Sequence, residues 1–314
     1  MTVAIVTDSA AALPSELVAR HGITVVPMWL TIGGASVREG ERPLSELLGD
    51  ERVSTSGPAP GEFQQAIESR LGDDGVLVLT IAASMSGTHE AATIAAGQLD
   101  DGVRVVDTAT AAGAEALVVL AAAAAAERGA SLDEVEAEAK DVVERVQLVA
   151  AVPSLDHLVR SGRVPGIAGW AGRRLRINPL FEFRGGRVHR LRPALSPDAA
   201  ADRMVGRLLR SREPNTRLHV AALHALAPGA AEGVLERVEA EVTPAAKFVG
   251  EFGSVMVVHT GPGLYGLAWW WEPDGNDPKL RAPSPLSGLQ VRIEGSSTQS
   301  TASRMAATDC GAKA

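Results

Sequence analysis

The first half of the chain alternates short apolar runs with segments of helical periodicity, and this alternation restricts the fold more than any other feature. The apolar runs are "VAIVT" (3–7), "ITVVPMWLTI" (23–32), "GVLVLTIA" (75–82) and "VRVVDT" (103–108). Helical segments separate them, and two long ones follow at 111–128 and 132–146. Strands that alternate with helices form a parallel sheet covered by helices. We therefore predict an α/β fold with an N-terminal domain over residues 1–152.

The pattern changes in the second half, where two strand-like runs flank Gly185-Gly186 and predict a hairpin. Helices are expected at 197–210 and 229–240, and a strand at 217–225. The apolar runs "SVMVVHT" (254–260) and "YGLAWWW" (265–271) are expected to be closing strands. These elements predict a mixed α/β domain over 153–273. From 274 to 314 Ser, Pro, Gly and Thr dominate, so this tail is predicted to be disordered.

Composition excludes several classes of function. A formal charge of −8 disfavours a nucleic-acid partner, because neutralising phosphates needs clustered Lys and Arg. The basic run "GRRLR" (172–176) is expected to be a solvated surface. The only cysteine, Cys310, excludes an intramolecular disulfide and a cysteine-ligated zinc site. No apolar run is long enough for an integral membrane segment, and no signal peptide is evident, so we expect a cytoplasmic location.

Three loops at strand ends carry residues suited to binding. Asp8 and Ser9 follow the first strand, Thr55 and Ser56 precede a helix, and "SMSGT" (84–88) precedes another. In an open α/β sheet, ligands bind beyond the carboxyl ends of the strands. Hydroxyls beside a glycine at a helix N-terminus favour an anion there. The alternative is that these hydroxyls only cap their helices.

The motif "GPGLYG" (261–266) matches the G-x-G-x-x-G spacing of a dinucleotide-binding motif but not its structural context. That motif needs a helix to begin within it, whereas a strand-like run follows here. We expect a glycine turn that presents His259 at the end of a strand. Asp107 is expected to orient a loop or cap a helix. Arg163 follows a short helix, and it either caps that helix or acts as a countercharge for a bound acid.

A catalytic function has weaker support in the sequence than a binding function. Ser86 and His259 could form a hydrolytic dyad, but no G-x-S-x-G elbow surrounds Ser86. No H-x-x-x-H or clustered carboxylate spacing predicts a metal site. No catalytic residue is therefore assigned from these patterns.

Seven motifs in order resemble the DegV family of bacterial fatty-acid-binding proteins. They are "VTDS" (6–9), "TSGP" (55–58), "SMSGT" (84–88), "VVDT" (105–108), "LVRSGRV" (158–164), "INPL" (177–180) and "HTGPGLYGL" (259–267). Each motif is short, but the set in this order and spacing is specific. The resemblance covers about residues 3–271.

The resemblance implies a carrier that buries one long-chain fatty acid between two α/β domains, with no cofactor and no catalysis. It implies that Thr55, Ser86, the Gly87 amide and His259 hold the carboxylate, with Arg163 nearby. It also implies a partner, a separate ATP-dependent fatty acid kinase that converts the presented acid to an acyl phosphate. Two other functions stay open at this point: a Ser86/His259 lipid or acyl ester hydrolase, and a phosphate- or nucleotide-binding module.

Overall fold

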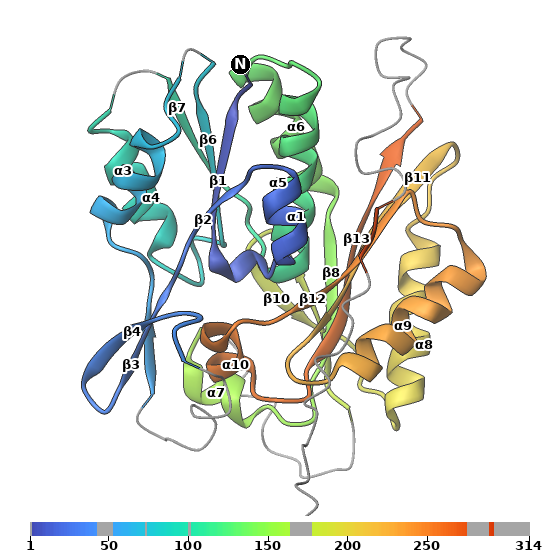
Figure 1. Cartoon of the computed structure of the whole chain (residues 1–314). Coiled ribbons are helices and arrows are strands. Elements are labelled where there is room, and N and C mark those ends of the chain that lie inside the picture. The colour runs from blue at the N-terminus through green and yellow to red at the C-terminus, as the bar shows by residue number, and fades with distance from the viewer. Residues whose placement is uncertain are drawn as a thin grey trace, which may run out of the picture.

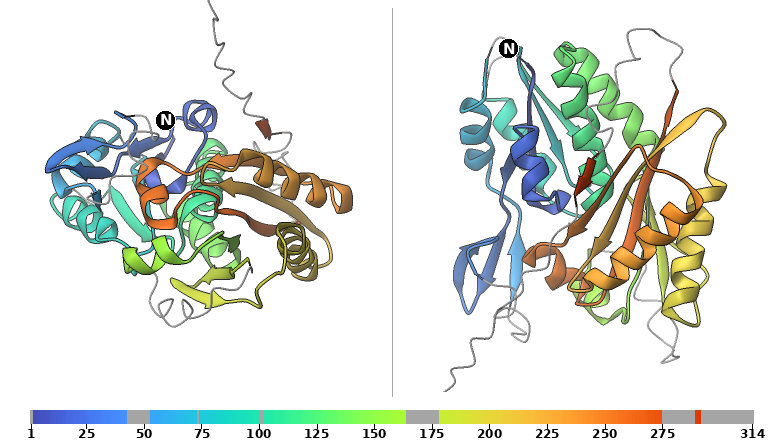
Figure 2. Two further views of the ribbon diagram at one scale, coloured as in Figure 1. Left: turned by 90° about the horizontal axis from the view of Figure 1, so that it is seen from below. Right: turned by 45° about the vertical axis from the view of Figure 1, so that its right-hand side comes forward.

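The computed structural model describes residues 2–42, 53–72, 74–99, 102–163, 178–274 and 289–291. The basic run at 172–176 and most of the tail lie outside these ranges, so the expectations for them stay predictions. Figure 1 shows the arrangement of the elements, and Figure 2 shows it from two further directions.

A parallel sheet organises the N-terminal half. Its order is β2-β1-β6-β7, and each neighbouring pair is parallel. The strands are β1 (Ala4–Asp8), β2 (Thr24–Val26), β6 (Val76–Thr80) and β7 (Val103–Asp107). β1 and β6 are buried along their whole length, which explains why their sequences are mostly apolar rather than alternating. The parallel sheet predicted from the sequence is confirmed.

Helices cover both faces of this sheet. On one face, α3 (Pro60–Glu68) and α4 (Thr88–Ala96) bury Phe63 and Ile67 against the strands. On the other lies α5 (Ala112–Glu127), beside α6 (Leu132–Arg145). A capping box begins α6, because Glu134 N donates to Ser131 Oγ and Ser131 N donates to the Glu134 carboxylate. The short helices η1 (Ser9–Ala11) and α1 (Ser15–Arg20) follow β1.

A larger mixed sheet organises the C-terminal half, in the order β10-β9-β8-β13-β11-β12-β14. Its strands are β8 (Gln147–Ala151), β9 (Leu180–Arg184), β10 (Arg187–Arg190), β11 (Thr216–His224), β12 (Ala246–Glu251), β13 (Tyr265–Pro273) and β14 (Leu289–Val291). β9 and β10 form the hairpin predicted around Gly185-Gly186. Helices α8 (Pro197–Arg210) and α9 (Pro228–Glu241) cover the outer face of this sheet.

Helix α5 lies between the two sheets and joins their cores. It contacts β1 and β6 on one side and β8, β11 and β13 on the other. All of its residues from Ala112 to Ala126 are buried. Because most of these side chains are alanine, both sheets can approach the helix axis closely. The alanine-rich run is therefore the shared central layer of an α/β/α/β/α arrangement.

A small antiparallel sheet extends from the N-terminal half toward two short helices. It has the order β4-β3-β5, built from β3 (Trp29–Ile32), β4 (Ala35–Arg38) and β5 (Ser54–Ser56). The helices α7 (Asp156–Ser161) and α10 (Ser254–Thr260) pack on each other, and α10 also contacts β5. Figure 2 shows this sheet beside α10 at one end of the molecule. Segments distant in sequence thus meet where the two halves adjoin.

Three features differ from the sequence prediction. The run "SVMVVHT" was expected as a strand, but it forms helix α10, so that prediction was wrong. Its valines favour a strand, but that preference depends on context, and the tertiary contact of Val255 N with Glu39 favours the helix. Strand β8 lies within the predicted N-terminal domain but pairs with β9 and β13 of the second sheet. Strand β14 lies within the predicted disordered tail but pairs with β12.

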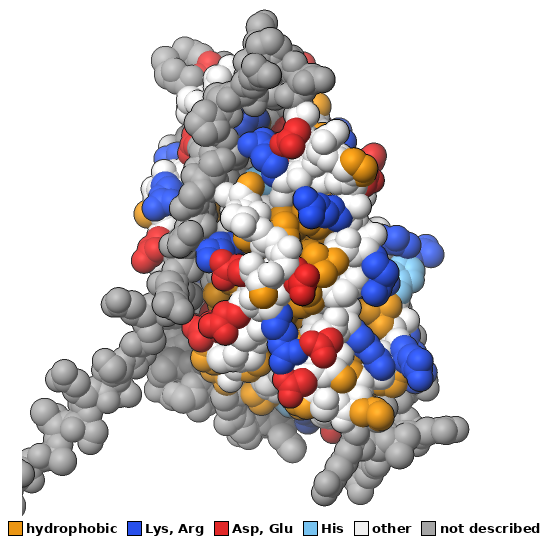
Figure 3. Space-filling model, turned by 90° about the vertical axis from the view of Figure 1, so that its right-hand side faces the viewer, with side chains coloured by type: hydrophobic (Ala, Val, Ile, Leu, Met, Phe, Trp, Pro, Cys, Tyr) orange, Lys and Arg blue, Asp and Glu red, His pale blue; other side chains and the backbone are white. Residues whose placement is uncertain are grey.

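The face over α8 and α9 carries acidic and basic side chains side by side (Figure 3). On it, Arg237 pairs with both Asp198 and Asp202. The three tryptophans of β13, Trp269, Trp270 and Trp271, are all buried. Within the described ranges, no helix is both long and apolar enough to cross a membrane.

Candidate functional site

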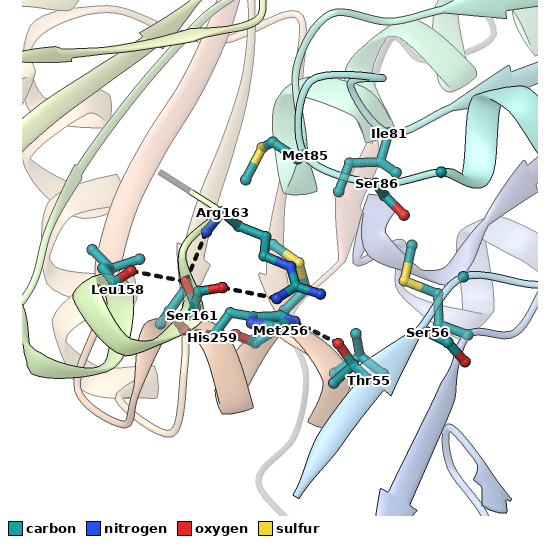
Figure 4. A pocket seen from close by; sticks show the side chains of 15 residues that line it. Thr55, Ser56, Ile81, Met85, Ser86, Leu158, Ser161, Arg163, Met256 and His259 are labelled. Carbon is teal, nitrogen blue, oxygen red and sulfur yellow. Dashed lines mark hydrogen bonds between the residues drawn. The ribbon is translucent and has the colours of Figure 1, made fainter. Parts of the chain in front are cut away.

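A cavity of about 180 Å³ lies where β5, the loop before α4, and helices α7 and α10 meet. All five residues that the resemblance assigns to the carboxylate site line it: Thr55, Ser86, Gly87, Arg163 and His259. Figure 4 shows Ser86 across the cavity from Thr55 and His259. Much of the remaining lining is apolar and includes three methionines and three branched aliphatic residues: Met28, Met85, Met256, Ile81, Leu158 and Val255. The cavity therefore combines hydrogen-bonding groups and a positive charge with an apolar lining.

Thr55 and His259 come from opposite halves of the chain and share a hydrogen bond. Thr55 lies on β5, paired with Leu30 of β3, and His259 lies in the last turn of α10. Thr55 Oγ1 and His259 Nε2 are 2.6 Å apart. The second ring nitrogen, His259 Nδ1, is buried and has no partner within the described part of the chain. The imidazole therefore has hydrogen-bonding capacity that the protein does not use.

His259 is a neutral residue at physiological pH. Burial, together with the nearby Arg163 guanidinium, lowers its pKa from 6.5 to about 4. The ring can thus act at neutral pH as a hydrogen-bond donor or acceptor, but it supplies no positive charge.

Ser86 and Gly87 form the opposite wall, at the start of α4. Gly87 is the N-cap of this helix, so the first-turn amides nearby lack intrahelical acceptors. Ser86 Oγ shares a hydrogen bond of 2.7 Å with Thr88 Oγ1. Gly57, which follows β5, lies so close that a Cβ there would come within 2.7 Å of Thr88 Oγ1. The absence of a side chain at Gly57 lets the two walls approach each other.

Arg163 supplies the positive charge. It follows α7, and its guanidinium lies between His259 and Ser86 in Figure 4. The Arg163 Nη1 donates to Ser161 O at 2.8 Å, and Arg163 N donates to Ser161 Oγ at 3.3 Å. Ser161 thus holds the arginine in place. It was not predicted as a site residue, although it stands within the "LVRSGRV" motif.

The loop after β1 does not contribute to this cavity. Asp8 is fully buried and accepts hydrogen bonds from Ala10 N and Ile81 N, both at 2.9 Å. Asp107 accepts from Ala83 N and Ala109 N and so orients the loop before Ser86, as predicted. Among the three candidate loops, the second and third therefore line the cavity, and the first supports it.

The geometry disfavours the hydrolase reading. Ser86 bonds to Thr88 and His259 bonds to Thr55, and no hydrogen bond joins Ser86 to His259 among the described residues. His259 also ends a helix rather than a strand, which corrects the expected setting of this residue. The "GPGLYG" segment begins as a turn after α10, with Gly261 and Gly263 at positive φ, and its last two residues belong to β13. Over the described ranges, no group of three or more His, Cys, Asp or Glu residues could hold a metal ion.

Comparison with known proteins decides the family. The family model whose description reads "Uncharacterised protein, DegV family" matches residues 2–272. A DegV domain-containing protein of Streptomyces coelicolor is 36% identical over 273 residues, which cover 84% of this chain and 97% of that protein. The chain belongs to the DegV family. The resemblance inferred from the seven motifs is therefore confirmed.

Solved structures of the DegV family share this fold. One, described as fatty acid binding of a DegV family protein from Thermus thermophilus, has a TM-score of 0.81 and 30% identity, and the match covers 86% of this chain and 99% of that one. A DegV lipid binding protein from Thermotoga maritima has a TM-score of 0.76 and 26% identity, with the same coverage. The predicted α/β fold class is confirmed.

Proposed function

We propose that the chain binds one long-chain fatty acid and presents its carboxylate to a fatty acid kinase. The observation that carries the proposal is the cavity that joins Thr55, Ser86 and His259 with one arginine and an apolar lining. Solved DegV proteins that bind fatty acids or lipids support the same ligand class. The kinase partnership rests on the family resemblance.

In this proposal the carboxylate lies between the two polar walls. Thr55, Ser86, the Gly87 amide and His259 offer hydrogen bonds, and Arg163 offers the countercharge. A hydrogen bond to a charged group contributes about 1.5–3 kcal/mol. A few such bonds orient the acid but do not account for tight retention of a lipid.

The acyl chain supplies the larger share of the free energy of binding. Burying about fourteen methylenes at about 0.8 kcal/mol each contributes roughly 11 kcal/mol, against an association cost of several kcal/mol. The cavity, at about 180 Å³, is smaller than the roughly 300–1,000 Å³ of pockets that enclose whole small ligands. We therefore assign it the carboxylate end and the first methylenes. Met28, Met85 and Met256 have flexible side chains, which can move aside to admit the rest of the acyl chain.

The charge of the cavity favours a carboxylate over a phosphate group. Among the lining residues that the structure describes, Arg163 is the one cation, His259 is neutral, and no Asp or Glu is present. A single positive charge balances a monoanion. A phosphate near neutral pH carries about 1.5–2 negative charges and would leave part of its charge uncompensated. The cavity thus supports a fatty acid better than a nucleotide.

The first experiment is native mass spectrometry of the purified protein, followed by titration with palmitate and oleate. Thr55→Val and His259→Asn are expected to weaken binding about tenfold or more, because the first removes the hydroxyl and the second replaces the imidazole at the carboxylate with a shorter side chain. Thr31→Val makes the same chemical change on neighbouring β3, outside the cavity lining, and is the matched control. Absence of both co-purified lipid and uptake of added acid would overturn the proposal.

The kinase step needs a separate assay. Protein loaded with fatty acid, a fatty acid kinase and ATP should yield an acyl phosphate, whereas the same mixture without this protein should not. Fatty acid binding without acyl phosphate formation would retain the carrier and remove the kinase partnership. Turnover of acyl esters that disappears in Ser86→Ala would instead support a hydrolase.

A further inference from the structure

Glu39 links the two halves of the molecule next to the cavity. It follows β4, and its carboxylate accepts from Ser9 Oγ in the loop after β1. The other oxygen, Oε1, accepts from Val255 N at 2.7 Å and from Ser254 Oγ at 3.5 Å. One side chain of the N-terminal half thus holds the first turn of α10, which belongs to the C-terminal half.

The sequence at α10 is adapted to this contact. Gly253 is the N-cap of the helix and has no side chain to cap the free amides. A Cβ at Gly253 would overlap the Glu39 carboxylate. Glu39 therefore occupies the place of the missing cap, and a carboxylate at a helix N-terminus is favoured by the helix dipole.

The opposite end of α10 carries His259. The helix has seven residues, and His259 follows Ser254 by five positions, so about 7.5 Å of helix axis separates the capped end from His259. The capped end also reaches the cavity directly, because Val255 lines it. Fixing one end of so short a helix fixes the direction in which His259 points toward Thr55.

The same contact positions Met28, a lining residue from the N-terminal half. Ser9 Oγ accepts from Met28 N at 3.0 Å while it donates to Glu39. Glu39 N donates to Met28 O at 2.9 Å. Met28 and Val255 both line the cavity, so Glu39 is bonded to lining residues from both halves of the chain without lining the cavity itself.

We propose that Glu39 is a positioning residue for the carboxylate-binding cavity: by capping α10 across the two halves, it places His259 for ligand binding. This inference rests on the proposed function. Burial raises the pKa of Glu39, while the hydrogen bonds from Ser9, Val255 and Ser254 oppose that rise. A carboxylate kept at a position where burial disfavours its charge is consistent with a specific role for these bonds.

The test is a double-mutant cycle read out by fatty acid affinity. Glu39→Ala is expected to weaken oleate binding about tenfold, and Glu39→Gln, which keeps an acceptor for Val255 N, is expected to restore most of the loss. In a His259→Asn background, Glu39→Ala should cause little further loss, because its effect passes through His259. Glu41→Ala removes an exposed carboxylate two positions away and should leave affinity unchanged.

A second readout needs no ligand. The imidazole signals of His259, followed by NMR against pH, should shift their midpoint upward in Glu39→Ala and not in Glu41→Ala, because the ring is released from its buried position. If wild-type protein binds no fatty acid, the proposed function fails while this titration still tests Glu39. Unchanged affinity in Glu39→Ala, a fully additive loss with His259→Asn, or an unchanged His259 midpoint would overturn the inference.

Discussion

Asp8 makes the stability of this protein depend on pH in an unusual direction. The residue ends β1 and is completely buried. Burial raises its pKa from 3.8 to about 7, and the negative charge of Glu39 adds to that rise. The hydrogen bonds from Ile81 N and Ala10 N lower the pKa, but desolvation outweighs them. The folded state therefore holds a proton that the unfolded chain releases near pH 4.

The sign and size of the effect follow from linkage. Between pH 4 and pH 7 the folded state binds more protons than the unfolded state, so the free energy of unfolding falls as pH rises. The contribution is fully present below about pH 4 and is lost as pH rises through about 7. Three pKa units at about 1.36 kcal/mol each correspond to about 4 kcal/mol, of which about 2–3 kcal/mol falls between pH 5 and pH 8.

The assay is urea unfolding of wild type and Asp8→Asn at pH 5 and pH 8. Asparagine keeps the shape of the side chain and cannot ionise, so its constant cost cancels when the two pH values are compared. Relative to Asp8→Asn, wild type should lose about 2–3 kcal/mol of unfolding free energy between pH 5 and pH 8. A difference between the two proteins that is the same at both pH values would refute the reasoning.

Three further predictions concern packing, binding and capping. Gly113→Ala should destabilise the protein by about 1–3 kcal/mol in urea unfolding, because the added Cβ would overlap Leu223 across the α5–β11 contact. The cost of this overlap outweighs the gain of about 1 kcal/mol in helix propensity. Fatty acid affinity should change less than about twofold between pH 6 and pH 8, since His259, with a pKa of about 4, stays neutral throughout this range. A marked loss of affinity as pH rises through about 6.5 would contradict this, because it would show that a charged His259 binds the carboxylate. Ser131→Ala should cost about 1 kcal/mol of unfolding free energy, because it removes the hydroxyl that accepts from Glu134 N at the start of α6; an unchanged denaturation midpoint would contradict this.

Local sequence signals located most elements correctly. The continuous apolar runs of β1 and β6, the capping box of α6 and the Gly185-Gly186 hairpin depend on residues within a few positions of one another. Helix α10 was missed because its decisive contact is not local: the acceptor for Val255 N is Glu39, 216 positions away. Glu39 itself was missed because "VREGE" has the appearance of an ordinary charged surface segment.

The sequence by itself determined the alternation of elements, the hydroxyls placed at helix starts, and the set of motifs that identifies the family. Only the tertiary structure decided that Thr55 and His259, 204 positions apart, share a hydrogen bond at one cavity. It also decided which candidate loop supports the cavity and which line it. The physical reason is range: capping, turns and periodicity act over a few residues. The meeting of the two halves depends instead on how closely both sheets pack against the alanines of α5.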